Sequence, residues 1–141
     1  MLSNTLKIVL ALPVIVYVLQ YLSQPTYPVH EHGGILVTGA STGIGRHAAL
    51  SLAGRGYTVY AGVRKQSDAA SLNGEGLGDR LRPIILDVTK TEQIAAAVTE
   101  IQASPEPFIA LVNNAGVDGH DVVELMDLEA ARWTFDVNFF G

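Results

Sequence analysis

The chain has no cysteine among its 141 residues. Disulfide bonds and thiolate metal sites are therefore excluded. Histidine is also scarce, and the four histidines do not stand at metal-ligand spacing with carboxylates, since His30 and His32 only flank Glu31. The sequence predicts no metal site.

Positive charge is scarce as well. The nine Lys and Arg residues face fourteen Asp and Glu residues, which gives a formal net charge of −5 at pH 7. The cations are scattered along the chain rather than clustered, so we expect no nucleic-acid partner. The chain also lacks internal repeats and low-complexity tracts, and its length suits a single domain with a real core.

One segment near the N-terminus differs from the rest. Residues 8–22 (IVLALPVIVYVLQYL) are almost entirely apolar, interrupted by Pro13 and Gln20 and preceded by Lys7. As a helix, about fifteen residues would extend roughly 23 Å, which is less than a typical 30 Å hydrocarbon core. A signal peptide, a buried helix and a retained membrane anchor are the alternatives.

We favour an anchor (or an uncleaved signal) over residues 1–23, because a short span suits a thin endomembrane such as the endoplasmic reticulum. The side of the membrane stays open. Residues 24–34 (QPTYPVHEHGG) carry two prolines and two glycines without periodicity, which is typical of a linker. The remaining residues, 35–141, form the predicted domain.

The most informative stretch is residues 38–45 (TGASTGIG). It lies between a short apolar run and a segment with helical spacing, and this arrangement presents backbone N–H groups at a helix N-terminus to a phosphate. Gly39 permits the tight turn, Gly43 lets the backbone approach a pyrophosphate, and Gly45 lets the helix pack closely on the strand. Ser41 and Thr42 add hydroxyls that can bond phosphate or ribose.

Strand and helix signals alternate along the rest of the chain. Four runs are typical of buried strands: residues 35–37, 57–61, 83–86 and 108–112. A helix is predicted over residues 44–55, with Ile44, Ala48 and Leu52 on one face, and a short one over residues 68–72. A third helix follows a Thr89–Glu92 capping box and has Ile94, Val98 and Ile101 on one face. A fourth follows an Asp127 cap and has Leu128, Ala131, Phe135 and Asn138 on one face. The pattern predicts an α/β fold, a Rossmann-type doubly wound parallel sheet in the order 3-2-1-4, with residues 108–112 at an edge.

The end of the second predicted strand bears on cofactor choice. An acidic residue about twenty positions after the glycines bonds the ribose 2′-OH of NAD, whereas an Arg there suits the 2′-phosphate of NADP. This chain has Val63, Arg64 and Lys65 at that place, and its next acid is Asp68. We therefore expect NADP(H) rather than NAD(H), with Arg64 and Lys65 near the phosphate.

Four ordered motifs resemble the short-chain dehydrogenase/reductase family of the classical type: TGASTGIG, the Asp87–Val88 pair, NNAG at residues 113–116, and Asn138 in VNFFG. The YAGVRK segment and the apolar N-terminus resemble membrane-anchored steroid and retinoid dehydrogenases. The resemblance implies that Asp87 and Val88 contact the adenine, that Asn138 is a catalytic residue of a proton relay, and that the other cofactor-binding residues are Gly39, Ser41, Thr42, Gly43, Ile44, Gly45, Arg64, Lys65, Asn113, Asn114, Ala115 and Gly116.

The chain departs from the family's pattern in one respect. Family members use a Ser and a Tyr-x-x-x-Lys, yet this chain has no tyrosine after Tyr60. We therefore expect an incomplete cofactor-binding domain, inactive alone, of an oxidoreductase acting on an alcohol or carbonyl of a lipophilic substrate such as a steroid, retinoid or lipid. We expect a homo-oligomer for the complete enzyme. The alternative is a non-catalytic, membrane-tethered module that binds nucleotide or pairs with a relative.

Overall fold

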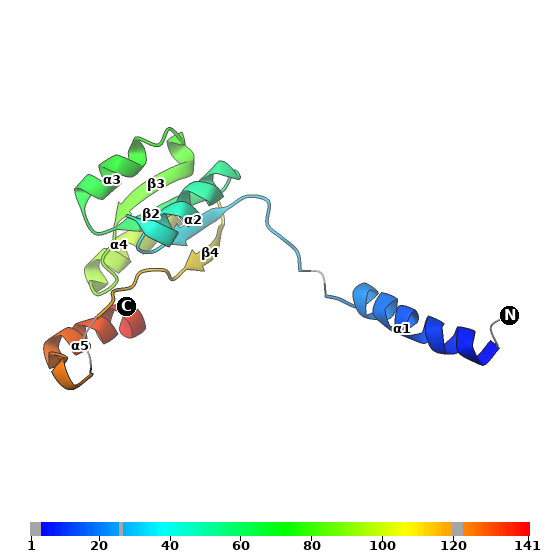
Figure 1. Ribbon diagram of the computed structural model, residues 1–141. Coiled ribbons are helices and arrows are strands. Elements are labelled where there is room, and N and C mark those ends of the chain that lie inside the picture. The colour runs from blue at the N-terminus through cyan, green and yellow to red at the C-terminus, as the bar shows by residue number, and fades with distance from the viewer. Residues whose placement is uncertain (1–3, 26, 120–122) are drawn as a thin grey trace.

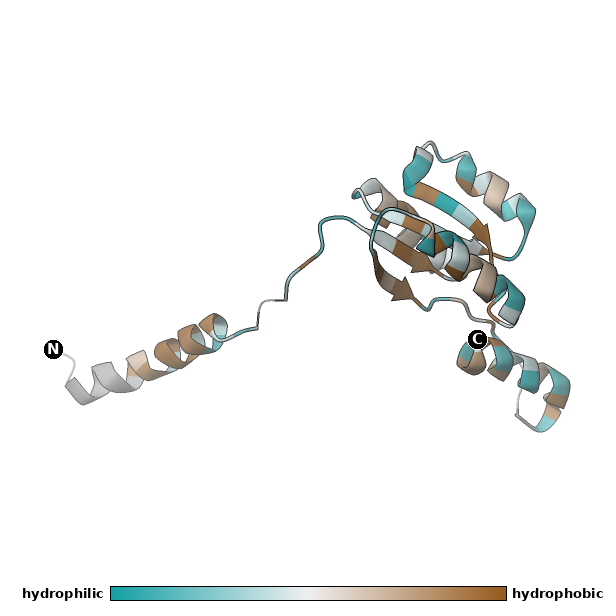
Figure 2. Cartoon of the chain, turned by 180° about the vertical axis from the view of Figure 1, so that it is seen from behind, coloured by the Kyte–Doolittle hydropathy of each residue, from teal (hydrophilic) through white to brown (hydrophobic). Residues whose placement is uncertain are grey.

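The computed structural model describes residues 4–25, 27–119 and 123–141. Helix α1 (Asn4–Leu22) lies apart from the other elements, to which an extended linker joins it (Figure 1). Its side chains from Leu10 to Leu22 are all exposed, and Figure 2 shows this stretch coloured as strongly apolar. Within the described ranges, no helix has both the length and the apolar character needed to cross a bilayer. The anchor expected over residues 1–23 therefore stays a prediction.

Four parallel strands form a single sheet in the order β3-β2-β1-β4. The strands are β1 (Gly34–Val37), β2 (Thr58–Val63), β3 (Leu81–Ile85) and β4 (Phe108–Val112). The expected fold class and strand order are confirmed. The predicted bounds of β4 match, whereas β2 runs two residues beyond its predicted end.

Helices cover both faces of the sheet, as Figure 1 shows. Helices α2 (Gly43–Gly54) and α3 (Gln66–Asn73) pack on one face through Ala49, Ala53, Ala69 and Leu72. Helix α4 (Thr91–Gln102) packs on the other face, where Ala97 and Ile101 meet Tyr60, Ile84 and Leu86. A short 3₁₀ turn, η1 (Gly78–Arg80), leads into β3.

The buried face of α2 differs from the expected one. Gly45, Ala49 and Ala53 face the sheet, whereas Ile44 is 82% exposed. The prediction that Ile44 begins the buried stripe was wrong, because small residues occupy the positions where the helix approaches the strands most closely. Ile44 instead projects from the first turn of the helix, beside the glycine turn.

The start and the buried face of α4 also differ from expectation. The predicted capping box is absent: Lys90 is the N-cap, with no side-chain capping bond, and the Thr89 hydroxyl donates to Asp87 instead. Ile94 and Val98 were expected on the buried face but are 40% and 45% exposed. Only the narrower stripe of Ala97 and Ile101 reaches the sheet.

The C-terminal segment packs more loosely than the sheet. It contains η2 (Val123–Leu125), α5 (Leu128–Phe135) and the π-helical turn η3 (Asp136–Phe140). As predicted, Asp127 caps α5 by accepting a hydrogen bond from the Glu129 N–H at 3.2 Å. No side chain of α5 is buried, and within η3 only Val137 is.

The end of the linker is fixed to the sheet. The Tyr57 hydroxyl donates to the carbonyl of His30 at 2.5 Å. Gly33 follows with φ +138°, and a Cβ there would lie 2.8 Å from Cγ2 of Ile109. The linker therefore docks on the domain before β1 begins.

Candidate functional site

A pocket of about 480 Å³ lies at the carboxyl ends of all four strands. This edge is where open parallel sheets bind their ligands. The lining residues come from the segments after each strand and from the C-terminal helical region: Gly39, Ser41, Thr42, Gly43, Ile44, Gly45, Val63, Arg64, Leu86, Asp87, Val88, Asn114, Ala115, Gly116, Val117, Trp133 and Val137. Twelve of the expected cofactor-binding residues, Arg64 among them, contribute to this wall.

The glycine turn forms one wall of the pocket. Gly39 and Gly43 have φ of +66° and +56°, a region that side chains rarely adopt. A Cβ on Gly43 would meet nothing within 4 Å, so the backbone is open to a ligand there. On Gly45, a Cβ would overlap the Gly39 carbonyl oxygen and the Asn114 side chain, so only glycine allows this close packing.

The start of α2 is suited to an anion. Thr42 is the N-cap, and its side chain makes no capping hydrogen bond. The first N–H groups of a helix have no acceptor within the helix and carry the positive end of its dipole. Because Thr42, Gly43 and Ile44 all line the pocket, this end of the helix can receive a phosphate group.

Thr38 connects the glycine turn to the segment after β4. Its hydroxyl accepts hydrogen bonds from the backbone N–H of Asn114 at 3.0 Å and of Ala115 at 2.9 Å. The Asn114 side-chain amide donates in return to the carbonyls of Thr38, at 2.9 Å, and Gly39, at 3.1 Å. Thr38 is 5% exposed. This partly buried network holds two walls of the pocket together, and no motif in the sequence assigns a role to Thr38 in advance.

Asp87 follows β3, and hydrogen bonds fix the position of its carboxylate. Its Oδ1 accepts from the Thr89 N–H at 3.0 Å and from the Thr89 hydroxyl at 2.8 Å. Partial burial raises the pKa of Asp87, but the two Thr89 hydrogen bonds and the charges of Arg64 and Lys90 outweigh it, so the pKa lies below its usual 3.8. Asp87 is therefore a carboxylate acceptor at neutral pH.

The two cations expected near the phosphate, Arg64 and Lys65, differ in their position relative to the pocket. Arg64 lines the pocket, close enough for its charge to act on Asp87. Lys65 is exposed at the N-cap of α3 and does not contribute to the pocket wall. Of the expected NNAG residues, Asn113 is also exposed and outside the wall, whereas Asn114, Ala115 and Gly116 line it.

Asn138 holds the backbone of one pocket-lining residue, Val117. Its side chain accepts from the Val117 N–H and donates to the Val117 carbonyl, both at 2.8 Å. Val117 lines the pocket, and so do Trp133 and Val137 from the same helical region. Trp133 and Val137 could not be predicted as pocket residues, because an apolar side chain on a predicted helix does not indicate which cavity it lines.

The glycine turn at a helix N-terminus, the acid after β3 and the basic residue after β2 define a dinucleotide-binding α/β domain. The family model for the short chain dehydrogenase matches residues 34–141. The chain belongs to the short-chain dehydrogenase family.

The similar proteins include two steroid dehydrogenases. The chain is 38% identical over 110 residues to 17-beta-hydroxysteroid dehydrogenase type 6 of Bos taurus, covering 76% of this chain and 34% of that protein. It is 37% identical over 141 residues to estradiol 17-beta-dehydrogenase 2 of Mus musculus, covering 92% and 36%. The chain thus spans about a third of these relatives' length.

A solved structure is also similar. A gluconate 5-dehydrogenase from Burkholderia cenocepacia, in complex with NADP and tartrate, superposes with a TM-score of 0.66 at 28% identity. The match covers 76% of this chain and 43% of that one.

Proposed function

We propose that the chain is the cofactor-binding part of an NADP(H)-dependent oxidoreductase that acts on an alcohol or carbonyl of a lipophilic substrate. The observation that carries the proposal is the meeting of Arg64, Asp87 and the open turn at Gly43 around one pocket. A cation, a carboxylate and helix N–H groups at these positions fit a 2′-phosphate, an adenosine and a pyrophosphate, respectively.

The residues divide between binding and support. Ser41, Thr42 and Gly43 would hold the pyrophosphate, Arg64 the 2′-phosphate, and Asp87 with Val88 the adenosine. The cofactor supplies hydride chemistry when bound. Asn114 and Asn138 fix the backbone beside the pocket through their hydrogen bonds to Thr38, Gly39 and Val117.

Cofactor preference tests the proposal. A charge-assisted bond from Arg64 contributes on the order of 1.5–3 kcal/mol, so NADP(H) should bind roughly tenfold to a hundredfold more tightly than NAD(H). Val63→Asp with Arg64→Ala should reverse the preference, because an acid at the strand end bonds the ribose and repels phosphate. Titration calorimetry measures both affinities, and Arg55→Ala, at the far end of α2, is the matched charge control. Equal affinities of the unchanged chain for both cofactors would refute the proposal.

The lipophilic substrate class is supported by the names of the relatives, which are steroid dehydrogenases. We also propose that the 141-residue chain alone is inactive, because it lacks the tyrosine and lysine that the family uses as proton donor and activator. A fluorescence assay of NADPH consumption with a steroid or retinoid carbonyl should detect no turnover. Turnover by the purified chain would show that another residue serves as the proton donor.

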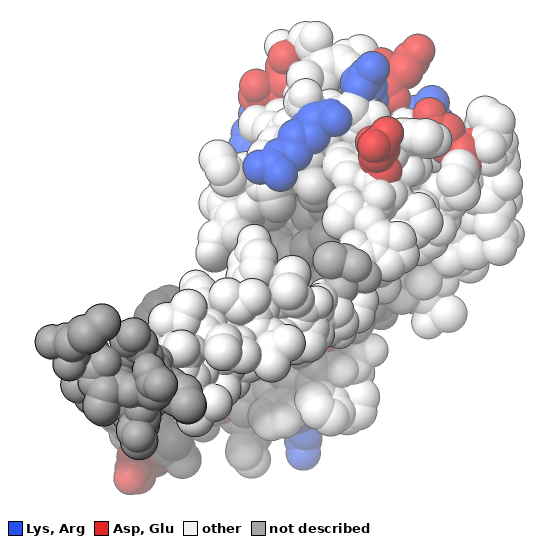
Figure 3. All heavy atoms as spheres, turned by 90° about the vertical axis from the view of Figure 1, so that its right-hand side faces the viewer, with Lys and Arg blue, Asp and Glu red and all other residues white. Residues whose placement is uncertain are grey.

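We further propose that the N-terminal segment binds the protein to an endomembrane such as the endoplasmic reticulum. Figure 3 shows the described part of this segment without Lys, Arg, Asp or Glu side chains, and its large apolar residues are exposed from Leu10 to Leu22. The expressed protein should stay in the membrane fraction after an alkaline carbonate wash. Release of the full-length chain, or a mature N-terminus near Gln24, would refute the tether.

A second candidate is a non-catalytic module that pairs with another chain. The exposed edge strand β4 favours it, because Phe108 and Leu111 are about half exposed there. Light scattering of the detergent-solubilised chain distinguishes the two functions: a stable dimer that does not bind NADP(H) favours the pairing module. A chain that binds NADP(H) as a monomer contradicts it.

A further inference from the structure

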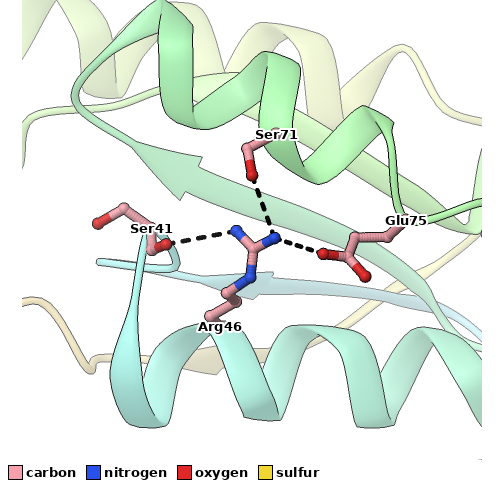
Figure 4. A network of polar contacts seen from close by, with 4 residues as sticks. All are labelled: Ser41, Arg46, Ser71 and Glu75. Atoms are coloured by element: carbon pink, nitrogen blue, oxygen red, sulfur yellow. Dashed lines mark hydrogen bonds and ion pairs between the residues drawn. The ribbon is translucent and has the colours of Figure 1, made fainter.

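An arginine outside the pocket connects the glycine turn, which lines the pocket, to the region of helix α3. Arg46 lies in the first turn of α2, and its Nη1 donates to the carbonyl of Ser41 at 3.4 Å (Figure 4). Its Nη2 donates to the Ser71 hydroxyl at 3.2 Å and forms an ion pair with the Glu75 carboxylate. The Arg46 and Glu75 side chains are 24% and 36% exposed.

One acceptor of Arg46 belongs to the pocket wall, and the other two lie on and just after the helix that follows the Arg64 turn. Ser41 lies in the glycine turn and lines the pocket. Ser71 is on α3 and Glu75 follows it, and α3 starts directly after Lys65, its N-cap, next to Arg64. The guanidinium therefore spans the gap between the glycine turn and the helix that follows the Arg64 turn, as Figure 4 shows.

The shape of the guanidinium suits this bridging role. Its planar fork can donate to acceptors on different segments at once, which an ammonium group does with less directional control. A single exposed ion pair contributes little, but here three acceptors from two elements share one side chain. Arg46 does not itself line the pocket, so its contacts act on the wall rather than on the ligand.

We propose that Arg46 is a positioning residue, held by Glu75, that sets the separation between Ser41 and the Arg64 turn and thereby the selectivity for a 2′-phosphate. This inference rests on the proposed NADP(H) preference. The alternative role is that of an additional positive charge attracting the phosphate. We call the positioning role the clamp. The two roles differ in the effect of Glu75, because the clamp needs the Glu75 ion pair, whereas an attracting positive charge is weakened by the Glu75 carboxylate.

Three variants of the full chain in mild detergent separate these roles. Arg46→Met removes the bridge, Glu75→Gln keeps an acceptor but removes the ion pair, and Arg55→Met removes a cation from the far end of the same helix. Among the residues that the structure describes, Arg55 has no side-chain hydrogen-bond or ion-pair partner. The measurements are the ratio of the dissociation constants for NAD⁺ and NADP⁺, and amide hydrogen exchange at residues 39–45 and 64–71 without cofactor.

The clamp predicts the same direction for both test variants. Arg46→Met should lower the NADP⁺ selectivity about fivefold and raise exchange in both segments by a similar factor, as expected for the loss of a partly exposed ion-pair network. Glu75→Gln should act in the same direction with a smaller effect, and Arg55→Met should change neither. A purely structural role would weaken both cofactors equally and leave the ratio unchanged.

Three results would overturn the proposal. A higher NADP⁺ selectivity in Glu75→Gln would show that Arg46 acts as a charge. Unchanged exchange in Arg46→Met would refute the clamp even where cofactor binding is weak. Equal affinities of the unchanged chain for both cofactors would instead refute the proposed NADP(H) preference, and the selectivity role with it, while the exchange measurement still decides whether Arg46 positions the wall.

Discussion

Strands β2 and β4 are both apolar runs, yet their surroundings differ. All six residues of β2 are buried, whereas Phe108 and Leu111 of β4 are 48% and 52% exposed. The same contrast continues into the helices: α2 and α3 bury residues against the sheet, but α5 buries none. An apolar run thus predicts a strand, while its burial depends on the neighbours on both sides.

The physical reason is the position of each strand in the sheet. Strand β2 pairs with β1 and β3, and α2, α3 and α4 cover its two faces. Strand β4 pairs only with β1 among the described strands, so one row of its backbone groups has no partner strand. The first three strands should therefore carry most of the stability, and the region from β4 onward most of the tendency to associate.

The largest effect should come from truncating a core leucine in the first region. Leu72→Ala on α3 removes a side chain that is 1% exposed, and it should lower the free energy of unfolding by about 2–5 kcal/mol. The matched change Leu128→Ala on α5, where the leucine is 71% exposed, should stay within about 0.5 kcal/mol. Urea unfolding of the full chain in detergent measures both. Similar losses for the two variants would contradict the division into regions.

A smaller loss is expected for Gly45→Ala, at the junction of α2 and the glycine turn. The new Cβ would overlap the Gly39 carbonyl and the Asn114 side chain, and such overpacking costs about 1–3 kcal/mol. In Gly54→Ala the new Cβ meets nothing within 4 Å, and the helix should gain about 0.5–1 kcal/mol. The same unfolding assay applies. If Gly45→Ala proved neutral, the close contact would not constrain the turn.

The edge of the sheet allows a test with little change in stability. Leu111→Lys places a charge on β4 and should reduce self-association of residues 33–141, because a lysine on an edge strand opposes pairing with another chain. We expect its stability to change by less than about 1 kcal/mol. Phe139→Lys on η3 is the control, since it replaces an exposed apolar residue away from the edge. Light scattering should show more monomer for the β4 variant alone.

The smallest effect concerns Asp87 and pH. Its folded-state pKa is lowered, so its contribution to stability is fully present above pH 3.8 and is lost as the pH falls through the folded pKa. In Asp87→Asn the free energy of unfolding should fall less steeply with pH below pH 3.8. In Thr89→Val the fall should begin at a higher pH, because one hydrogen-bond donor to the carboxylate is removed. Urea midpoints between pH 6 and pH 3 measure the change. If Asp87→Asn left the loss of stability at low pH unaltered, Asp87 would not be its source.

Much of the fold could be read from the sequence because buried parallel strands have a simple signal. Each strand is a continuous apolar run, and each is followed by a helix, so the order β3-β2-β1-β4 follows from the family of folds that such alternation allows. The bounds of β2 were less accurate. Gly62 and Val63 continue the strand although the turn residues Arg64 and Lys65 follow at once.

The site could be predicted where backbone conformation required glycine. Gly39, Gly43 and Gly45 have distinct roles that only glycine satisfies, and the structure confirms the turn and the close packing. The contributions of Thr38 and Arg46 could not be read in advance. Their hydrogen bonds reach partners 76 and 29 residues away, which no local pattern specifies.

Side chains near helix starts were predicted least well. Thr89 was expected to cap α4 by accepting from a helix N–H, but its hydroxyl instead donates to the Asp87 carboxylate two residues earlier, and Lys90 is the N-cap. Ile44 was expected in the core, but the turn places Gly45 there. Periodicity gives the spacing of a helical stripe, whereas the preceding turn decides which residue begins it.

The bond from Tyr57 to the carbonyl of His30 shortens the effective tether. With His30 held on the domain, only residues 23–29 separate α1 from the α/β part. Seven residues reach at most about 25 Å when fully extended. The pocket therefore stays within a few nanometres of whatever surface α1 occupies. The local concentration at which the pocket meets a molecule dissolved in that surface is then set by the length of this tether rather than by the bulk solution. Tyr57→Phe would lengthen the reach without changing a residue of the linker.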